Sequence, residues 1–103
     1  MGELKKTRDV NEPYASLEHS RADWEWRILK IYKKGSTAAK DKYARAFCAV
    51  MSPMTYGSWE YGDVYLTELF DTGDMRQMSS SDEFEDWLDE YRDAGGRFTC
   101  RNG

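Results

Sequence analysis

The sequence predicts an α+β domain with a three-stranded antiparallel meander, a C-terminal amphipathic helix packed on one face of the sheet, and a short N-terminal helix. Three observations support this fold class. The chain has 103 residues, a length that favours one domain with one core. Aromatic and branched residues fill two strand-like stretches, 24–34 and 43–51, with a connection containing Gly and Ser between them. Near the C-terminus, the apolar residues change to helical spacing.

The first twelve residues are polar and show no periodicity, so we expect a flexible start (1–12) before a single domain at 13–103. Pro13 fits the first turn of a helix, and Tyr14 and Leu17 would share one side of it. We therefore predict a short N-terminal helix, which would be too short to be stable without tertiary contacts.

The first strong strand pattern is DWEWRILKIYKKG. Trp24, Trp26 and Ile28 fall on alternate positions, whereas Leu29 and Ile31 alternate in the opposite phase. This change of phase predicts either a β-bulge near Ile28 or a strand that is buried on both faces at one end.

The second strand pattern, YARAFCAVM, is apolar at odd and even positions from Ala46 onward. Such a run predicts a central strand covered on both faces, and its small residues favour a helix packed close to it. Cys48 lies in this run and is expected to be a buried, inert thiol. A disulfide between Cys48 and Cys100 is the alternative, but a cytoplasmic location argues against it.

The stretch MTYGSWEYGD (54–63) predicts a hairpin, because Gly57-Ser58 fits the centre of a two-residue type II′ turn. The third strand would be DVYLTELF (63–70), and DTGDMRQM (71–78) would be a loop. Pro53 and Gly62 would lie opposite each other, where the ladder would deform. The turn would place four side chains on one face, namely those of Met54, Tyr56, Trp59 and Tyr61.

Tyr56, Trp59 and Tyr61 are therefore a candidate protein-binding surface at the hairpin tip, since Tyr and Trp are enriched at interface hot spots. The alternative is that the C-terminal helix covers them as part of the core. Glu60 and Asp63 lie beside these aromatics and would let the tip and the acidic helix form one contact patch.

SSSDEFEDWLDEYRDAGG carries the clearest helix pattern in the chain. Ser80 and Glu83 fit a capping box, and Gly95 fits the position just past the helix end. The apolar residues fall at i, i+3, i+4 and i+7, as one buried stripe requires: Phe84, Trp87, Leu88 and Tyr91.

Charge is sorted along the chain, whose net charge is −4 and whose pI is about 5.0. Residues 26–45 contain seven basic residues and one acidic residue, whereas residues 60–93 contain two basic and twelve acidic residues. Any solvated helix face carries some polar residues, and Asp and Glu can serve as these. However, like charges at i, i+4 and acidic residues near the C-terminus both oppose helix stability. The number of acidic residues on this helix therefore exceeds what helix stability favours.

We therefore expect a small non-enzymatic protein-binding module, whose acidic helix engages a protein partner with a basic surface, as an inhibitor would. The candidate residues on that helix are Asp82, Glu85, Asp86, Asp89, Glu90 and Asp93. The alternative function is single-stranded nucleic-acid binding by the aromatic, basic hairpin 24–45. Its candidate residues are Arg27, Lys30, Lys33, Lys34, Lys40 and Lys42.

The sequence contains no catalytic, nucleotide-binding or metal-binding motif, and we expect no enzymatic activity, cofactor or metal. His19 is the single histidine, and the two cysteines lack zinc-ligand spacing. No apolar run is long enough to span a membrane and no signal peptide is visible, so we expect a cytoplasmic protein. In size, acidity and lack of catalytic groups, the chain resembles small accessory proteins of phages and plasmids, including anti-CRISPR and antirestriction inhibitors. The resemblance carries no motif, so it assigns no functional residue.

Overall fold

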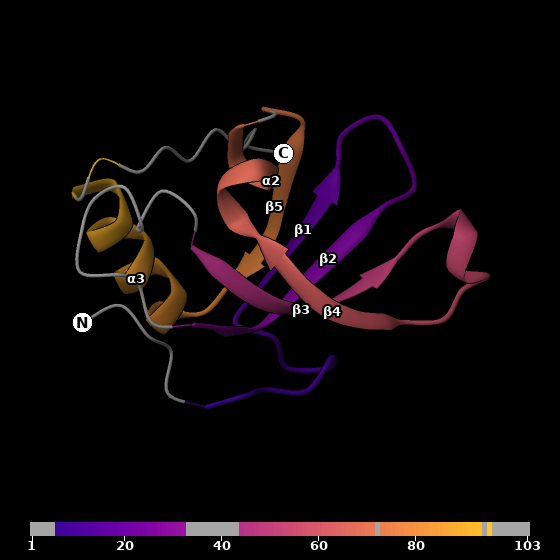
Figure 1. Cartoon of the computed structure of the whole chain (residues 1–103), viewed down its shortest axis with the longest axis horizontal. Helices are drawn as coiled ribbons and strands as arrows, with labels where there is room; N and C mark the ends of the chain where they lie inside the picture. Colours follow the sequence, from indigo (N-terminus) through magenta and orange to yellow (C-terminus); the bar gives the residue numbers. More distant parts are fainter. Residues whose placement is uncertain (1–5, 33–43, 72, 94, 96–103) are drawn as a thin grey trace.

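The computed structural model describes residues 6–32, 44–71, 73–93 and 95, which form an α+β domain with a five-stranded antiparallel sheet and a C-terminal helix (Figure 1). The sheet order is β4-β3-β2-β1-β5. Along the chain, the elements are β1 (Ala15–His19), β2 (Glu25–Ile31), β3 (Arg45–Met51), the 3-10 helix η1 (Pro53–Thr55), β4 (Glu60–Tyr65), α2 (Leu66–Asp71), β5 (Met75–Ser80) and α3 (Asp82–Asp93).

The prediction of an N-terminal helix is wrong, because residues 15–19 form strand β1. β1 pairs with β2 on one side and with β5 on the other, so two ladders satisfy its backbone groups. Ala15 and Leu17 fall on the same face of β1 and are both fully buried. The sheet supplies these tertiary contacts, and a five-residue helix would have lacked them.

The predicted three-stranded meander is present as β2-β3-β4, but β1 and β5 extend it to five strands. Residues 75–78, predicted as part of a loop, and Ser79 and Ser80, predicted at the start of the helix, form the edge strand β5 against β1. β5 is polar because an edge strand needs few core residues, and Met75 is its one fully buried side chain among those described.

The predicted third strand ends earlier than expected, because the chain turns into helix α2 after Tyr65. Leu66 and Phe70 lie four residues apart, on the same side of α2, and both are fully buried. α2 belongs to the connection that carries the chain from the β4 edge of the sheet to the β5 edge.

The predicted β-bulge is confirmed in β2. Ile28 pairs with Cys48 and Lys30 pairs with Phe47, so Leu29 is the extra residue. Leu29 is nevertheless buried, and its carbonyl accepts a hydrogen bond from the Arg8 amide at 2.9 Å. The bulge therefore explains the change of phase in the sequence.

The predicted type II′ turn at Gly57-Ser58 is wrong. Val50 pairs with Glu60, so Tyr61 lies opposite Ala49 rather than Met54, and Gly62 lies opposite Cys48 rather than Pro53. The connection is longer because residues 53–55 form η1, with Pro53 in its first turn.

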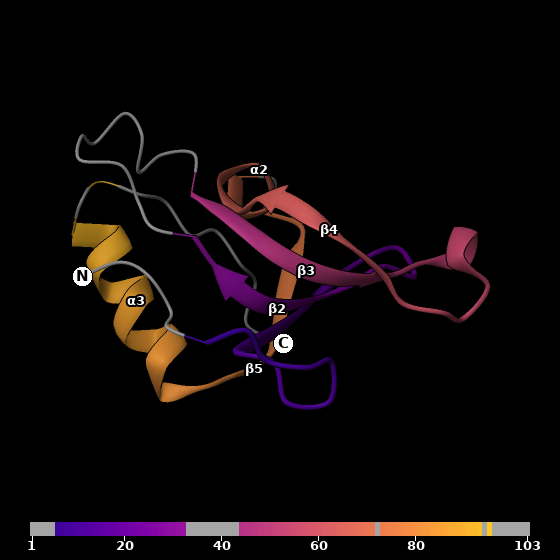
Figure 2. The same ribbon diagram turned by 60° about the horizontal axis from the view of Figure 1, so that its bottom comes forward.

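One face of the sheet packs against α2 and α3 to form the core, as the two ribbon views indicate (Figures 1 and 2). Tyr91 of α3 stacks on Trp87 and meets Phe70 of α2 edge to face. The predicted apolar stripe of α3 is confirmed, since all four members are buried: Phe84, Trp87, Leu88 and Tyr91.

Part of the N-terminal segment 6–14 lies against the opposite, outer face of the sheet, while Tyr14 belongs to the core cluster and Arg8 pairs with Glu83 of α3. The Arg27 Nη1 group donates to the Val10 carbonyl at 2.6 Å, and the Tyr14 hydroxyl donates to the Lys6 carbonyl at 2.5 Å. No helix in the described part of the chain is long and apolar enough to cross a bilayer.

Candidate protein-binding surfaces

Helix α3 begins one residue later than the predicted capping box requires. Ser81 is the N-cap: its Oγ accepts a hydrogen bond from the Phe84 amide at 3.2 Å, and its carbonyl accepts one from the Glu85 amide at 3.1 Å. The prediction of Ser80 and Glu83 as the box is therefore wrong. Gly95 adopts φ +92° and donates to the Arg92 carbonyl, as the predicted position past the helix end requires.

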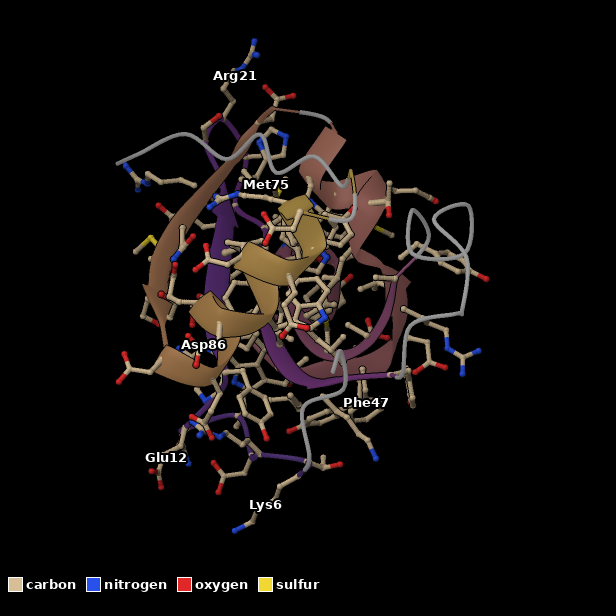
Figure 3. The ribbon with its side chains drawn as sticks, turned by 90° about the vertical axis from the view of Figure 1, so that its left-hand side faces the viewer. Lys6, Glu12, Arg21, Phe47, Met75 and Asp86 are labelled. Carbon is tan, nitrogen blue, oxygen red and sulfur yellow. The ribbon has the colours of Figure 1, made fainter. Side chains whose placement is uncertain are left out.

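Four carboxylates on α3 form one exposed stripe, which we call the acidic stripe. They fall at i, i+4, i+7 and i+11, on one side of the helix: Asp82, Asp86, Asp89 and Asp93. Figure 3 faces this end of the molecule, with Asp86 labelled on α3. The apolar stripe anchors the helix to the core, so the acidic stripe is held outward.

The other two predicted acidic residues differ from this stripe. Glu85 is half-buried and accepts hydrogen bonds from Ser80 Oγ at 2.5 Å and Gln77 Nε2 at 2.9 Å. These two bonds, from the hydroxyl first and then the amide, lower the pKa of Glu85. Glu90 is also half-buried. Glu85 therefore stabilises the junction of β5 and α3 rather than facing a partner.

The acidic stripe is little neutralised by the rest of the described molecule. Asp89 lies 3.9 Å from Arg92, with the Asp89 side chain 73% exposed. Within residues 6–32, 44–71 and 73–93, no ion pair involves Asp82, Asp86 or Asp93.

The arginines of the sheet and its connections are paired elsewhere. Their ion pairs are Arg21 with Asp74, Arg27 with Glu25, Arg45 with Asp63, and Arg76 with Glu18. None of these four pairs reaches α3. Among the ion pairs whose two partners are both described, two involve α3. Arg8 pairs with Glu83 at 2.7 Å, and Arg92 of the helix itself lies 3.9 Å from Asp89.

The hairpin tip projects from the sheet and exposes large side chains. Met54 is 76% exposed and Tyr56 is 93% exposed. Ser52 caps η1: its Oγ accepts from the Met54 amide at 3.2 Å, and the Thr55 hydroxyl donates to the Ser52 carbonyl at 2.9 Å. Tyr56 then adopts φ +54°, which is uncommon for a residue with a side chain. The tip is thus an ordered turn that presents Met54 and Tyr56 outward.

The other two tip aromatics pack on the outer face of the sheet. Trp59 is half-buried, with the Arg27 guanidinium 4.6 Å from its ring centroid. Tyr61 stacks on Phe47 at 6.1 Å between ring centroids and stays 56% exposed. The tip and α3 lie at opposite ends of the long axis in Figures 1 and 2, so they do not form one contact patch.

The candidate nucleic-acid residues are only partly described. Arg27 is held by Glu25 and Val10, and Lys30 is half-buried with its Nζ 6.0 Å from the Tyr32 ring. Lys33, Lys34, Lys40 and Lys42 lie outside the described residues. Of the aromatics in this hairpin, Trp26 is buried and stacks on the half-buried Trp24.

Sequence reasoning missed a cluster on the outer face at the β2–β3–β4 end. The Tyr32 hydroxyl donates to Asp63 at 2.9 Å, and the Arg45 guanidinium lies 4.4 Å from the Tyr32 ring. The Asp63 bond is the main reason that the pKa of Tyr32 is raised. Tyr65, directly opposite Arg45, is 49% exposed. The alternation of Tyr61, Asp63 and Tyr65 was the available signal.

Cys48 is buried in the core as predicted, and burial raises the pKa of its thiol to about 12. Such a thiol is not a nucleophile at neutral pH. Cys100 lies outside the described residues. Among the residues that the structure describes, no group of three His, Cys, Asp or Glu side chains is arranged to hold a metal ion.

Comparison of the chain with protein-family models, with curated proteins and with solved structures finds no match.

Proposed function

We propose that this chain is a small protein-binding module that engages a cationic surface of another protein through the acidic stripe of α3. One observation carries the proposal. The four stripe carboxylates are exposed, share one side of the helix, and receive only one cation from the described residues, Arg92 at 3.9 Å from Asp89. A carboxylate stripe of this kind suits a surface that normally holds a polyanion, so the module would act as an inhibitor of that binding.

The acidic stripe also lowers the stability of helix α3, which supports a role in binding rather than in folding. Asp82 and Asp86, like Asp89 and Asp93, are like-charge pairs four residues apart, a spacing that destabilises a helix by about 0.2–0.5 kcal/mol per pair. Asp89 and Asp93 also stand near the C-terminus, where the helix dipole disfavours anions. Asp82, in the first turn, is favoured by the same dipole, but helix stability does not account for Asp86, Asp89 and Asp93.

The test is affinity capture with two variants of equal net charge. The first replaces Asp86, Asp89 and Asp93 with lysine. The control replaces three exposed acids away from the stripe, Glu12, Asp23 and Glu68, with lysine. Proteins captured from a lysate are identified by mass spectrometry, and their affinity is then measured with purified components, with and without heparin as a competing polyanion.

We expect the stripe variant to lose its captured partner while the control keeps it, and heparin to release the partner. Circular dichroism should show both variants folded. Equal loss in both variants would mean a nonspecific charge effect, and unchanged affinity in the stripe variant would exclude the proposal.

The second candidate function is single-stranded nucleic-acid binding on the outer face of the sheet. Its support is that guanidinium groups lie over aromatic rings there, Arg27 over Trp59 and Arg45 over Tyr32. Titration with fluorescent oligonucleotides at low salt tests this function. Absence of binding at high micromolar protein would remove it.

A further inference from the structure

β4 is an edge strand, and its open side can be assigned residue by residue. The Leu66 amide donates to the Ala44 carbonyl at 2.8 Å, one step beyond the Arg45–Tyr65 pair. In an antiparallel ladder, pairs that exchange hydrogen bonds alternate with pairs that do not. Glu60, Gly62 and Val64 therefore bond toward β3, whereas the N–H and C=O groups of Tyr61, Asp63 and Tyr65 point away from it.

The same three residues place their side chains on the outer face, opposite the core-facing Val64. Tyr61 and Tyr65 are 56% and 49% exposed, and Asp63 lies between them. An incoming strand would thus meet main-chain donors and acceptors together with two aromatic rings and a carboxylate. This combination gives both affinity and side-chain selection in strand addition.

β4 lacks the features that protect the other edge of the sheet. The β4–β3 register runs without interruption from Tyr65 to Glu60, whereas the β5–β1 register shifts between Ser16 and Leu17. Bulges of that kind and prolines discourage pairing at edges, and β4 contains neither. At Gly62, a Cβ atom would have no neighbour within 4 Å, so the strand is not crowded there.

The charge around this edge selects a cationic occupant. β4 itself contains no lysine or arginine, and its exposed charges are Glu60 and Asp63. Arg45 of the neighbouring strand β3 lies 3.9 Å from Asp63. Lysine or arginine at alternate positions of an added strand would face Tyr61, Asp63 and Tyr65, where the two exposed rings offer cation–π contact. Asp63, which also accepts a hydrogen bond from the Tyr32 hydroxyl, adds negative charge beside them. A polyanion would instead meet these carboxylates.

We propose that β4 accepts an extended cationic segment of a partner protein as a sixth strand of the sheet. The proposal deepens the proposed function and rests on it only for the class of partner, a cationic protein. The site itself is separate from α3, so its test can succeed or fail independently.

The test uses a nine-residue peptide in which lysine alternates with valine and threonine, with both ends blocked. Amide hydrogen exchange is followed by NMR on the full chain. In the free protein, the Tyr61, Asp63 and Tyr65 amides should exchange at least about tenfold faster than those of Gly62 and Val64, because only the latter two donate to β3. Saturating peptide should slow the three fast amides by at least about tenfold and leave the other two unchanged.

Two controls separate strand addition from simple charge attraction. The first is the same peptide with N-methyl groups that remove its backbone donors, which should give no protection. The second compares Tyr61→Pro with Tyr61→Thr: both remove the ring, but only proline removes the outward N–H while leaving the bonds to β3. Proline should weaken peptide binding about tenfold more than threonine, because one main-chain hydrogen bond is lost. If the proline variant does not fold, the methylated peptide decides.

Four results would overturn the proposal. The first is equal protection by the methylated peptide, and the second is a perturbation confined to the α3 amides. The third is protection that rises with protein concentration in the absence of peptide, which would make a second copy of the chain the occupant. The fourth is protection by oligothymidine but not by the peptide. The Asp86, Asp89 and Asp93 lysine variant separates the two sites. If strand addition holds, that variant keeps edge protection whatever happens to its captured partner.

Discussion

Tyr56 is the residue at which local strain and exposure coincide. Its backbone lies in the left-handed region with φ +54°, and its side chain is 93% exposed, so no core contact compensates for the conformation. A left-handed residue with a side chain costs about 1–2 kcal/mol, and asparagine tolerates the region better. The position is therefore a place where stability and any binding role can be separated.

We predict that Tyr56→Asn raises the free energy of unfolding by up to about 1 kcal/mol, measured by urea denaturation. Tyr61→Asn serves as the comparison and should destabilise the fold, because Tyr61 stacks on Phe47 within a strand. If Tyr56 contacts a partner, Tyr56→Asn weakens capture while stabilising the protein. A loss of stability in Tyr56→Asn would contradict the strain argument.

Glu85 gives the fold a dependence on acid pH. The Ser80 and Gln77 hydrogen bonds lower its pKa below the ordinary 4.5, so the folded protein binds fewer protons than the unfolded chain near that pH. The resulting stability is fully present above about pH 4.5 and is lost as pH falls through the folded-state pKa.

We therefore predict that Glu85→Gln loses less stability than the parent protein between about pH 6 and about pH 3, measured by urea unfolding at each pH. Glu12→Gln is the matched control, because Glu12 is exposed and its side chain makes no hydrogen bond within the described residues. Parallel pH curves for the parent protein and Glu85→Gln would count against this origin of the acid dependence.

At the scale of elements, α3 and β2 were predictable because each carries a strong local pattern. The stripe of α3 matches a helix at every apolar position, and the phase change in β2 marks the bulge at Leu29. β1 and β5 were not predictable in the same way. β1 is only five residues long, and β5 is mostly polar, so both become strands through pairing, β1 with β2 and β5, and β5 with β1, rather than through their own patterns.

The start of α3 shows the limit of capping signals in a run of serines. Ser79, Ser80 and Ser81 are adjacent, and only the structure identifies Ser81 as the N-cap. We predict that Ser81→Ala lowers the free energy of unfolding by about 1 kcal/mol, measured by urea denaturation. Ser79→Ala, at an exposed position of β5, should change it by less than about 0.5 kcal/mol. Equal effects would place the cap elsewhere.

For the whole molecule, the main result is that the two protein-binding surfaces predicted from the sequence lie apart. The acidic stripe of α3 occupies one end and the hairpin tip the other, along an axis of 39 Å (Figure 1). The sequence predicted both candidate surfaces and the separation of charge, but it allowed them to form one contact patch, which is wrong. Their relative positions depend on the sheet order, which no local pattern encodes.

This separation predicts additive energetics. The Tyr56→Asn and Ser81→Ala changes in unfolding free energy should sum in the double variant to within about 0.5 kcal/mol, since distant sites without shared contacts do not couple. Urea denaturation of the two single variants and the double variant provides the measurement. A larger deviation would mean that the two ends communicate through the sheet.

The pairing of β1 with β5 has a consequence for biosynthesis. Of the paired residues of β1 and β5, His19 and Met75 are the nearest in sequence, and more than half of the 103 residues still separate them. By contrast, β2, β3 and β4 pair in sequential order. On the ribosome, β1 is made early but lacks its second neighbour until the last third of the chain emerges. The nascent chain therefore exposes an open ladder during synthesis, and closing this long-range contact is expected to limit the folding rate.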